Sequence, residues 1–223
     1  MPTVLITGCD TGIGREFACQ YLADGAHVIA TYRDVSNGLP AAPTLINAPL
    51  DVTDASAIAQ LRTDLGGRPI DILISNAAVG LDAMKLGTID YARVREMFEV
   101  NTIGALRVIE TFVDQVAASE QRRIAIVSSR MGSMGANISG GSYGYRASKA
   151  ALNAIGRSLA VDLIHKGITV TMFHPGRAMT PGGGPGARLP VADSVAGMRT
   201  IIDRLGNHET GQFITYAGHP LPW

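Results

Sequence analysis

The sequence has no excess of charge of either sign, because its 19 lysines and arginines equal its 19 aspartates and glutamates. Proteins that bind nucleic acid or an acidic membrane surface usually carry a basic excess or a basic stripe. This chain shows neither, so we expect no nucleic-acid partner and no membrane partner. A neutral chain fits an enzyme that acts on a small molecule.

Cysteines and long apolar runs are also scarce. No hydrophobic run is long enough to cross a bilayer, and the first residues pass directly into strand-like sequence without the basic segment of a secretion signal. The two cysteines, Cys9 and Cys19, flank an expected helix start. In a chain without a secretion signal we expect both to be reduced. These features predict a cytoplasmic protein.

Apolar residues are abundant, at 46% against 17% charged, which is enough to bury a large core in one domain of residues 1–223. Short apolar runs rich in β-branched residues alternate with longer segments of helical period, as is typical of parallel strands joined by crossover helices. We therefore predict a single doubly wound, Rossmann-type α/β domain with a six- or seven-stranded parallel sheet flanked by helices. The expected strands are 3–7, 27–32, 44–50, 70–75, 123–129, 168–174 and 212–216.

Two expected helices, 13–22 and 145–165, have apolar positions at three- and four-residue steps. The segment 175–190 is rich in glycine and proline and can continue neither a strand nor a helix. It directly follows an expected strand, and open α/β sheets bind ligands at the ends of their strands. We interpret it as a lid over a ligand, with a plain surface loop as the alternative.

A glycine-rich turn lies between the first expected strand and the first expected helix. Glycine lets the backbone approach a phosphate group without a Cβ clash, and the helix that follows presents unpaired N–H groups and the positive end of its dipole. The strand before the turn and the amphipathic helix after it favour dinucleotide binding over a plain glycine turn. The expected cofactor-binding residues are Gly8, Asp10, Thr11, Gly12, Ile13 and Gly14.

The end of the second expected strand bears on the choice between the two nicotinamide cofactors. An acidic residue there accepts hydrogen bonds from the ribose hydroxyls of NAD. This sequence has Tyr32 at that position and Arg33 after it, and a guanidinium can bind the 2′-phosphate of NADP(H). We therefore predict a preference for NADP(H). Asp34 keeps NAD(H) open if the register differs by two residues.

Tyr145 and Lys149 are four residues apart in an expected helix, which puts their side chains on one helix face. A free phenol titrates near ~10, so it is a poor acid–base catalyst at neutral pH unless a neighbouring cation favours its ionised form. Lys149 is positioned to be that cation. Tyr143 is six residues from Lys149 and would project elsewhere, so we select Tyr145 of the two.

With these motifs the sequence resembles the short-chain dehydrogenase/reductase family over essentially its whole length. The resemblance rests on the glycine turn, on the tyrosine and lysine pair, and on further motifs that follow in the family's order. These are the adenine-contacting pair Asp51 and Val52, the segment Ser75, Asn76, Ala77 and Ala78, the helix asparagine Asn101, the serine Ser129, and Pro175, Gly176 and Thr180 beside the nicotinamide.

The resemblance implies a role for each catalytic candidate. Tyr145 is expected to be the general acid for carbonyl reduction, and Lys149 to lower its pKa and hold the nicotinamide ribose, so both also contact the cofactor. Ser129 is expected to orient the substrate oxygen, and Asn101 to steady a proton-relay water. The residues alone leave a structural alternative for two of them. Asn101 could merely hydrogen-bond to the backbone of its helix, and Ser129 could merely cap a strand end.

Some positions depart from the family pattern. Ser75 and Ala78 replace an asparagine and a glycine. Arg177 stands where an apolar residue is more usual, and its contact stays open between a cofactor phosphate, an anionic substrate and solvent. A long glycine-rich insertion precedes Tyr145, and the chain ends in Pro-Leu-Pro-Trp. Both features resemble the small carbonyl-reductase branch that includes sniffer-type reductases and C-signal proteins.

These motifs predict an oxidoreductase that transfers a hydride between NADP(H) and a small carbonyl or alcohol substrate, without a metal. A signalling or sensing protein that binds NADP(H) is the main alternative, although it would not need the proton-transfer residues. A hydrolase could use Ser142, in Gly-x-Ser-x-Gly, with His208 or His219. A nucleophile elbow, however, needs a strand directly before the turn. The substrate, and whether the chain forms a homo-oligomer, stay open.

Overall fold

The computed structural model describes residues 1–33, 38–80, 84–184, 186–206 and 209–223. Within these ranges the strands form one seven-stranded sheet in the order β3-β2-β1-β4-β5-β6-β7, and every neighbouring pair is parallel. The strands are β1 (Thr3–Ile6), β2 (His27–Tyr32), β3 (Leu45–Pro49), β4 (Ile72–Ser75), β5 (Arg123–Val127), β6 (Thr169–His174) and β7 (Gln212–Thr215).

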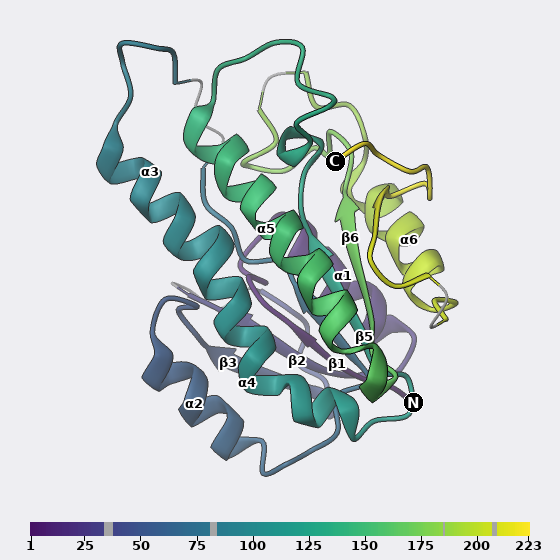
Figure 1. Cartoon of the computed structure of the whole chain (residues 1–223). Helices are drawn as coiled ribbons and strands as arrows, with labels where there is room; N and C mark the ends of the chain where they lie inside the picture. The colour runs from purple at the N-terminus through teal and green to yellow at the C-terminus, as the bar shows by residue number, and fades with distance from the viewer. Residues whose placement is uncertain (34–37, 81–83, 185, 207–208) are drawn as a thin grey trace.

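Helices cover both faces of the sheet (Figure 1). One face carries α1 (Gly12–Ala23) and α6 (Val191–Ile202), which contact each other. The other carries α2 (Ala55–Asp64), α3 (Tyr91–Phe98), α4 (Ala105–Ala117) and α5 (Tyr143–Asp162), with contacts between α2 and α4 and between α3 and α5. Three short turns complete the described elements: the π-helical η1 (Glu99–Gly104) and the 3₁₀ turns η2 (Arg130–Gly132) and η3 (Ile164–Lys166).

The central strands are apolar because both faces of the sheet are covered. In β4 the alternation of side chains sends Leu73 into the core on one face, while Ile72 and Ile74 enter the core on the other. All three side chains are fully buried. A parallel strand buried on both faces therefore shows a continuous apolar run, which is the pattern that identified it in the sequence.

The predicted doubly wound sheet is confirmed, and each of the seven expected strands lies within two residues of its predicted bounds. The long helix α5 begins at Tyr143, two residues earlier than expected, and ends at Asp162. Cys9 and Cys19 are both free thiols. Among the helices that the structure describes, none combines the length and apolarity that crossing a bilayer requires.

Candidate active site

A pocket of about 680 Å³ opens at the carboxyl edge of the sheet, with walls from the segments after β1, β2, β3, β4, β5 and β6. The order of the strands reverses between β1 and β4, and crevices at such reversals are where open α/β sheets bind ligands. The predicted residues that line it are Gly8, Asp10, Thr11, Gly12, Ile13, Arg33, Asp51, Val52, Asn76, Ala77, Ala78, Tyr145, Lys149, Pro175 and Thr180.

Five predicted site residues do not line this pocket: Gly14, Tyr32, Asn101, Ser129 and Gly176. Two of them are glycines that other parts of the backbone approach closely. A Cβ at Gly14 would collide with the carbonyl oxygen of Gly8, and Gly176, with φ +76°, packs between Leu189 and the ring of Tyr216. Both glycines therefore shape the walls of the pocket from behind.

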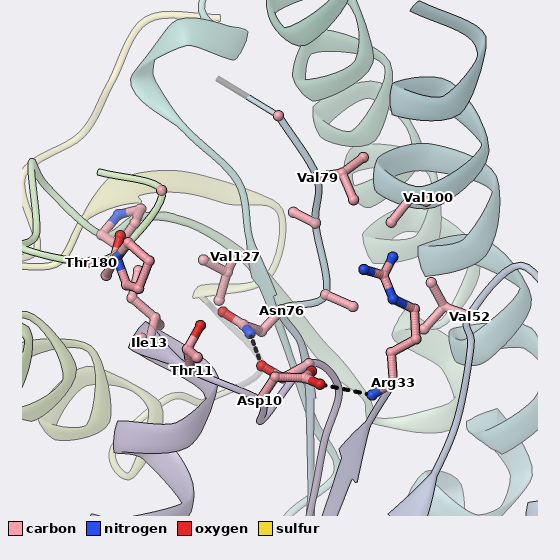
Figure 2. A pocket seen from close by; sticks show the side chains of 18 of the residues that line it. Asp10, Thr11, Ile13, Arg33, Val52, Asn76, Val79, Val100, Val127 and Thr180 are labelled. Carbon is pink, nitrogen blue, oxygen red and sulfur yellow. Dashed lines mark hydrogen bonds between the residues drawn. The ribbon is translucent and has the colours of Figure 1, made fainter. Parts of the chain in front are cut away.

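The glycine turn is held in place from the neighbouring strand. Gly8 adopts φ +72°, which an L side chain rarely does. The amide of Asn76, which follows β4, donates hydrogen bonds of 3.0 Å to the carbonyls of Thr7 and Gly8, and Asn76 lies beside Asp10 of the glycine turn in Figure 2. The main-chain N–H groups of Asn76 and Ala77 in turn donate to the Thr7 hydroxyl at 3.0 and 3.1 Å. The turn is thus fixed before any ligand arrives.

The N-terminus of α1 opens into the same pocket. Thr11 is the N-cap residue, but its side chain makes no capping hydrogen bond, and the first turn of the helix contains no acidic residue. Such a helix end favours an anion through its N–H groups and the positive end of its dipole. The glycine turn and the start of α1 together fit a dinucleotide pyrophosphate.

Arg33 lines the pocket directly after β2. Its main-chain N–H donates to Asp10 Oδ1 at 2.9 Å, which ties the end of β2 to the glycine turn. In Figure 2 the side chain extends from there toward Val52 and Val100. Tyr32 is the last residue of β2, paired in register with Pro49 of β3. Asp34, the residue that would favour NAD(H), lies outside the described residues.

Tyr145 and Lys149 both reach the pocket from α5. The Lys149 Nζ atom lies 6.0 Å from the centroid of the Tyr145 ring. It donates a hydrogen bond of 3.0 Å to the carbonyl of Val127, the last residue of β5. The lysine side chain is almost wholly buried, with 2% of its surface exposed.

Burial dominates the ionisation of this pair. It raises the pKa of Tyr145, and a hydrogen bond with the Ser129 side chain acts in the opposite direction. Burial also lowers the pKa of Lys149 to about 8. Ser129 thus opposes the rise in the pKa of Tyr145. From the sequence, we expected Lys149 to lower this pKa. The ammonium is instead engaged with a main-chain carbonyl.

Ser129 and Asn101 do not line the pocket, and their side chains make different contacts. The Ser129 hydroxyl accepts a hydrogen bond of 3.1 Å from the N–H of Met131 and so caps η2. Asn101 belongs to the π-helical turn η1 and is fully buried. Its amide accepts from the N–H of Val79 at 2.8 Å, and donates to the Val79 carbonyl and to the Ser148 hydroxyl, each at 3.1 Å. Asn101 thus ties the segment after β4 to α5.

The loop 175–190 turns back on itself beside the pocket. Met179 donates its N–H to the Leu189 carbonyl at 2.9 Å, and Ala178 forms an isolated bridge with Leu189. A Cβ at Gly12 would lie 3.1 Å from the Thr180 methyl group, so the loop packs directly against the glycine turn. Because Thr180, Pro181 and Gly182 line the pocket, the loop forms part of its wall.

Sequence reasoning missed several lining residues. They are small or apolar neighbours of the predicted ones: Leu50, Val79, Gly80, Val100, Val127, Ser128, Pro181 and Gly182. Most follow directly after a strand or stand beside a recognised motif. The signal that could have found them was their position at the carboxyl edge of the sheet, because all but Ser128 have side chains without a polar or ionisable group.

Ser142 does not stand in a nucleophile elbow. The strand β5 ends at Val127, and the turn η2 and a loop separate it from Ser142, which directly precedes α5. His219 is exposed, and His208 lies outside the described residues. The hydrolase alternative therefore lacks the strand–turn–helix geometry that it needs.

Comparison with known proteins adds an independent line of evidence. The family model described as short chain dehydrogenase matches residues 2–185. The C-signal protein of Myxococcus xanthus is 44% identical over 155 residues, which are 70% of this chain and 93% of that protein. The 1-hydroxy-2-glutathionyl-2-methyl-3-butene dehydrogenase of Rhodococcus sp. is 34% identical over 232 residues, with all of both chains covered.

Solved structures of carbonyl reductases share the fold. An NADPH-bound carbonyl reductase from chicken fatty liver matches with a TM-score of 0.89 at 28% identity, covering 100% of this chain and 99% of that one. The carbonyl reductase Sniffer of D. melanogaster matches with a TM-score of 0.90 at 26% identity, covering 100% of both chains. Both lie in the branch that the sequence motifs indicated.

Proposed function

This chain belongs to the short-chain dehydrogenase family and is an oxidoreductase, and we propose that it transfers a hydride between NADP(H) and a carbonyl or alcohol substrate. The observation that carries the proposal is the shared position of Tyr145 and Lys149. Both line, from α5, the same pocket that the glycine turn lines. A proton donor and a dinucleotide cradle therefore face one space.

The pocket fits NADP(H) on its own geometry. A Cβ at Gly8 would lie 2.8 Å from the Cα of Ala77, so only glycine lets the turn pack this closely against the segment after β4. Arg33 lines the pocket at the adenosine end, where its guanidinium would bind the 2′-phosphate. The chicken carbonyl reductase, whose structure contains NADPH, supports the same choice. When bound, NADPH supplies the hydride.

Tyr145 donates the proton to the oxygen of the forming alcohol in the reducing direction and accepts it in the oxidising direction. A hydrogen bond from Ser129 stabilises the phenolate that this cycle requires. With a pKa of about 8, Lys149 is mostly protonated at neutral pH. Its ammonium bonds to Val127 with one of three N–H groups, and the others can serve the nicotinamide ribose.

Asn101 acts as a positioning residue. Its side chain is fully buried and bonded to Val79 and Ser148, so it does not reach the substrate. Ser148 is the residue next to Lys149 in α5. Asn101 thus joins the segment after β4, which contains Val79, to α5, which contains Tyr145 and Lys149. In this way it fixes the distance between the cofactor-binding and the catalytic residues of the pocket.

The experiment that tests this function is a panel of aldehydes and ketones incubated with the protein and NADPH. Loss of NADPH absorbance at a rate proportional to protein concentration, with formation of the matching alcohol, is the expected result. A panel without any turnover, by a protein that binds NADPH, would favour a second candidate. That candidate is a signalling role based on cofactor binding alone, and the similarity to the Myxococcus C-signal supports it.

A further inference from the structure

Charge is distributed unevenly along the carboxyl edge of the sheet. The segments after β1 and β3 carry the carboxylates Asp10, Asp51 and Asp54. The segments that follow β5, β6 and β7, which are 128–142, 175–190 and 216–223, contain no aspartate or glutamate. They contain three arginines, namely Arg130, Arg177 and Arg188. In a chain of zero formal charge, the side chains of these three segments therefore carry a net positive charge.

Arg130 is an arginine beside the catalytic candidate Ser129, and neither of these two residues lines the pocket. It follows Ser129 directly and begins η2 at the end of β5. Its side chain is exposed and makes no hydrogen bond or ion pair with any part of the chain that the structure describes. An arginine one residue from the serine that contacts Tyr145 thus has its full donor set available to a ligand.

The neighbouring cations have other tasks or stand farther away. The Arg177 guanidinium packs against Gly186 inside the loop 175–190. Arg146 donates to the Gly141 carbonyl at 3.1 Å and to the Ser139 hydroxyl at 2.8 Å, and so shapes the loop before α5. Arg188 lies at the other end of the same loop and bonds through its main-chain N–H to the Arg177 carbonyl at 3.2 Å, and it does not directly follow a catalytic candidate in the sequence.

His174 provides a second indication of where the Arg130 charge lies. It ends β6, and because Val127 pairs with Phe173, it lies next to the first residue after β5. Burial, and to a smaller extent the charge of Arg130, lower the pKa of His174 to about 4. The imidazole is therefore neutral at pH 7, and the guanidinium is close enough to affect it. The positive charge of Arg130 thus acts at the shared end of β5 and β6.

We propose that Arg130 is a specificity-determining residue that binds an anionic group, a carboxylate or a phosphate, on the carbonyl substrate. A guanidinium binds such groups with two parallel hydrogen bonds, which fixes orientation as well as adding affinity. The segments after β5, β6 and β7 contain no aspartate or glutamate that could pair with Arg130, which favours an anionic group of the substrate as its partner. This inference rests on the proposed function, because it requires the reacting carbonyl to lie at Tyr145, on the side of the pocket from which Ser129 and Arg130 extend.

Matched pairs of aldehydes test the proposal. The probes are 3- and 4-carboxybenzaldehyde and the methyl ester of each, which differ in charge but share the reacting carbonyl. We expect the wild type to prefer at least one acid over its ester. Arg130→Gln should lower kcat/KM for that acid by roughly 10- to 100-fold, the range for a lost charge-assisted hydrogen bond, and change the ester by less than about 3-fold. Arg130→Lys should retain part of the preference.

Arg204→Gln is the matched control. It removes the same charge from an exposed residue beyond the C-terminal end of α6, away from the pocket lining, and should leave both substrates unchanged. Equal kcat/KM for acid and ester in the wild type, or an equal loss for both in Arg130→Gln, would overturn the inference. So would a weaker Kd for NADPH in Arg130→Gln with an unaltered substrate preference. No NADPH oxidation with any of the four aldehydes would count against the proposed function itself, and this inference would fall with it.

Discussion

The buried ammonium of Lys149 donates a hydrogen bond of 3.0 Å to the carbonyl of Val127, and so joins the catalytic helix to the end of β5. This contact positions the lysine but does not offset its loss of water, since burial lowers its pKa to about 8. Lys149→Met keeps most of the side-chain volume and removes the charge. Turnover and NADPH affinity should both fall, because the variant loses the cation near Tyr145 and the expected donor to the ribose. Steady-state rates and NADPH titration measure the two effects.

The same burial predicts a pH dependence of stability. The lysine pKa is about 8 in the folded chain, against 10.5 for the ordinary side chain. Between these values the unfolded chain holds more protons, so the free energy of unfolding rises with pH. The wild type should gain up to roughly 3 kcal/mol relative to Lys149→Met from pH 8 to pH 10.5. Urea unfolding of both proteins across this range checks it, and a pH-independent difference would contradict it.

Arg33 is predicted to select NADPH over NADH. Arg33→Ala should weaken NADPH binding by roughly 1–3 kcal/mol, the range for a lost charge-assisted partner, and leave NADH almost unchanged. The main-chain bond from Arg33 to Asp10 survives this substitution, so the end of β2 should keep its shape. Titration with both reduced cofactors at moderate salt measures the effect. Arg68→Ala, at an exposed arginine outside the pocket lining, is the control. Equal or tighter NADH binding by the wild type would refute the preference.

The loop 175–190 should respond to ligand in one part only. Its two ends are bonded to each other, since Arg188 and Leu189 donate their N–H groups to the Arg177 carbonyl, each at 3.2 Å. The segment 181–184 contains three consecutive glycines, which restrain the backbone little. Hydrogen exchange should therefore slow in 181–184 when NADPH and substrate bind, and change little at 188–189. Equal protection of 181–184 in the free protein and the ternary complex would exclude a lid.

The parts of the fold that could be predicted are those with a local signal. Strands such as β4 are apolar on both faces, and the glycine turn stands between a strand and an amphipathic helix, so each is recognisable from a few adjacent residues. The order of the motifs then brought them to one edge, because parallel strands all end on the same side of the sheet. Tyr145 and Lys149 reach the pocket for this reason.

Contacts between distant segments could not be predicted. The bond from Lys149 to Val127 joins residues 22 positions apart, and the bonds from Asn101 to Val79 span the same separation. Neither leaves a pattern in residue type, because the acceptor or donor is main chain. The expectation that Lys149 sets the pKa of Tyr145 considered helix spacing alone. Burial and the Ser129 contact, which dominate that pKa, depend on tertiary packing.

Tyr145→Phe separates chemistry from binding at the centre of the site. The ring and its packing remain, and only the hydroxyl that would donate the proton is lost. NADPH affinity should change by less than about 3-fold, while turnover falls at least ~100-fold, the lower range for general acid catalysis. Tyr143→Phe is the matched control, since Tyr143 starts the same helix, is 44% exposed and does not line the pocket.

The direction of the reaction adds a second readout for Tyr145. Alcohol oxidation needs the phenolate as a base, and burial raises the pKa of Tyr145, so the rate of oxidation should fall as pH is lowered. Carbonyl reduction uses the protonated phenol and should tolerate the same change. Initial rates in both directions, measured on one substrate pair from pH 6 to pH 10, give the comparison. If Tyr145→Phe retains near-wild-type turnover on a substrate that the wild type reduces well, the proposed proton transfer is wrong. The binding-only alternative would not explain that result either, because turnover would then be real and would depend on a different residue.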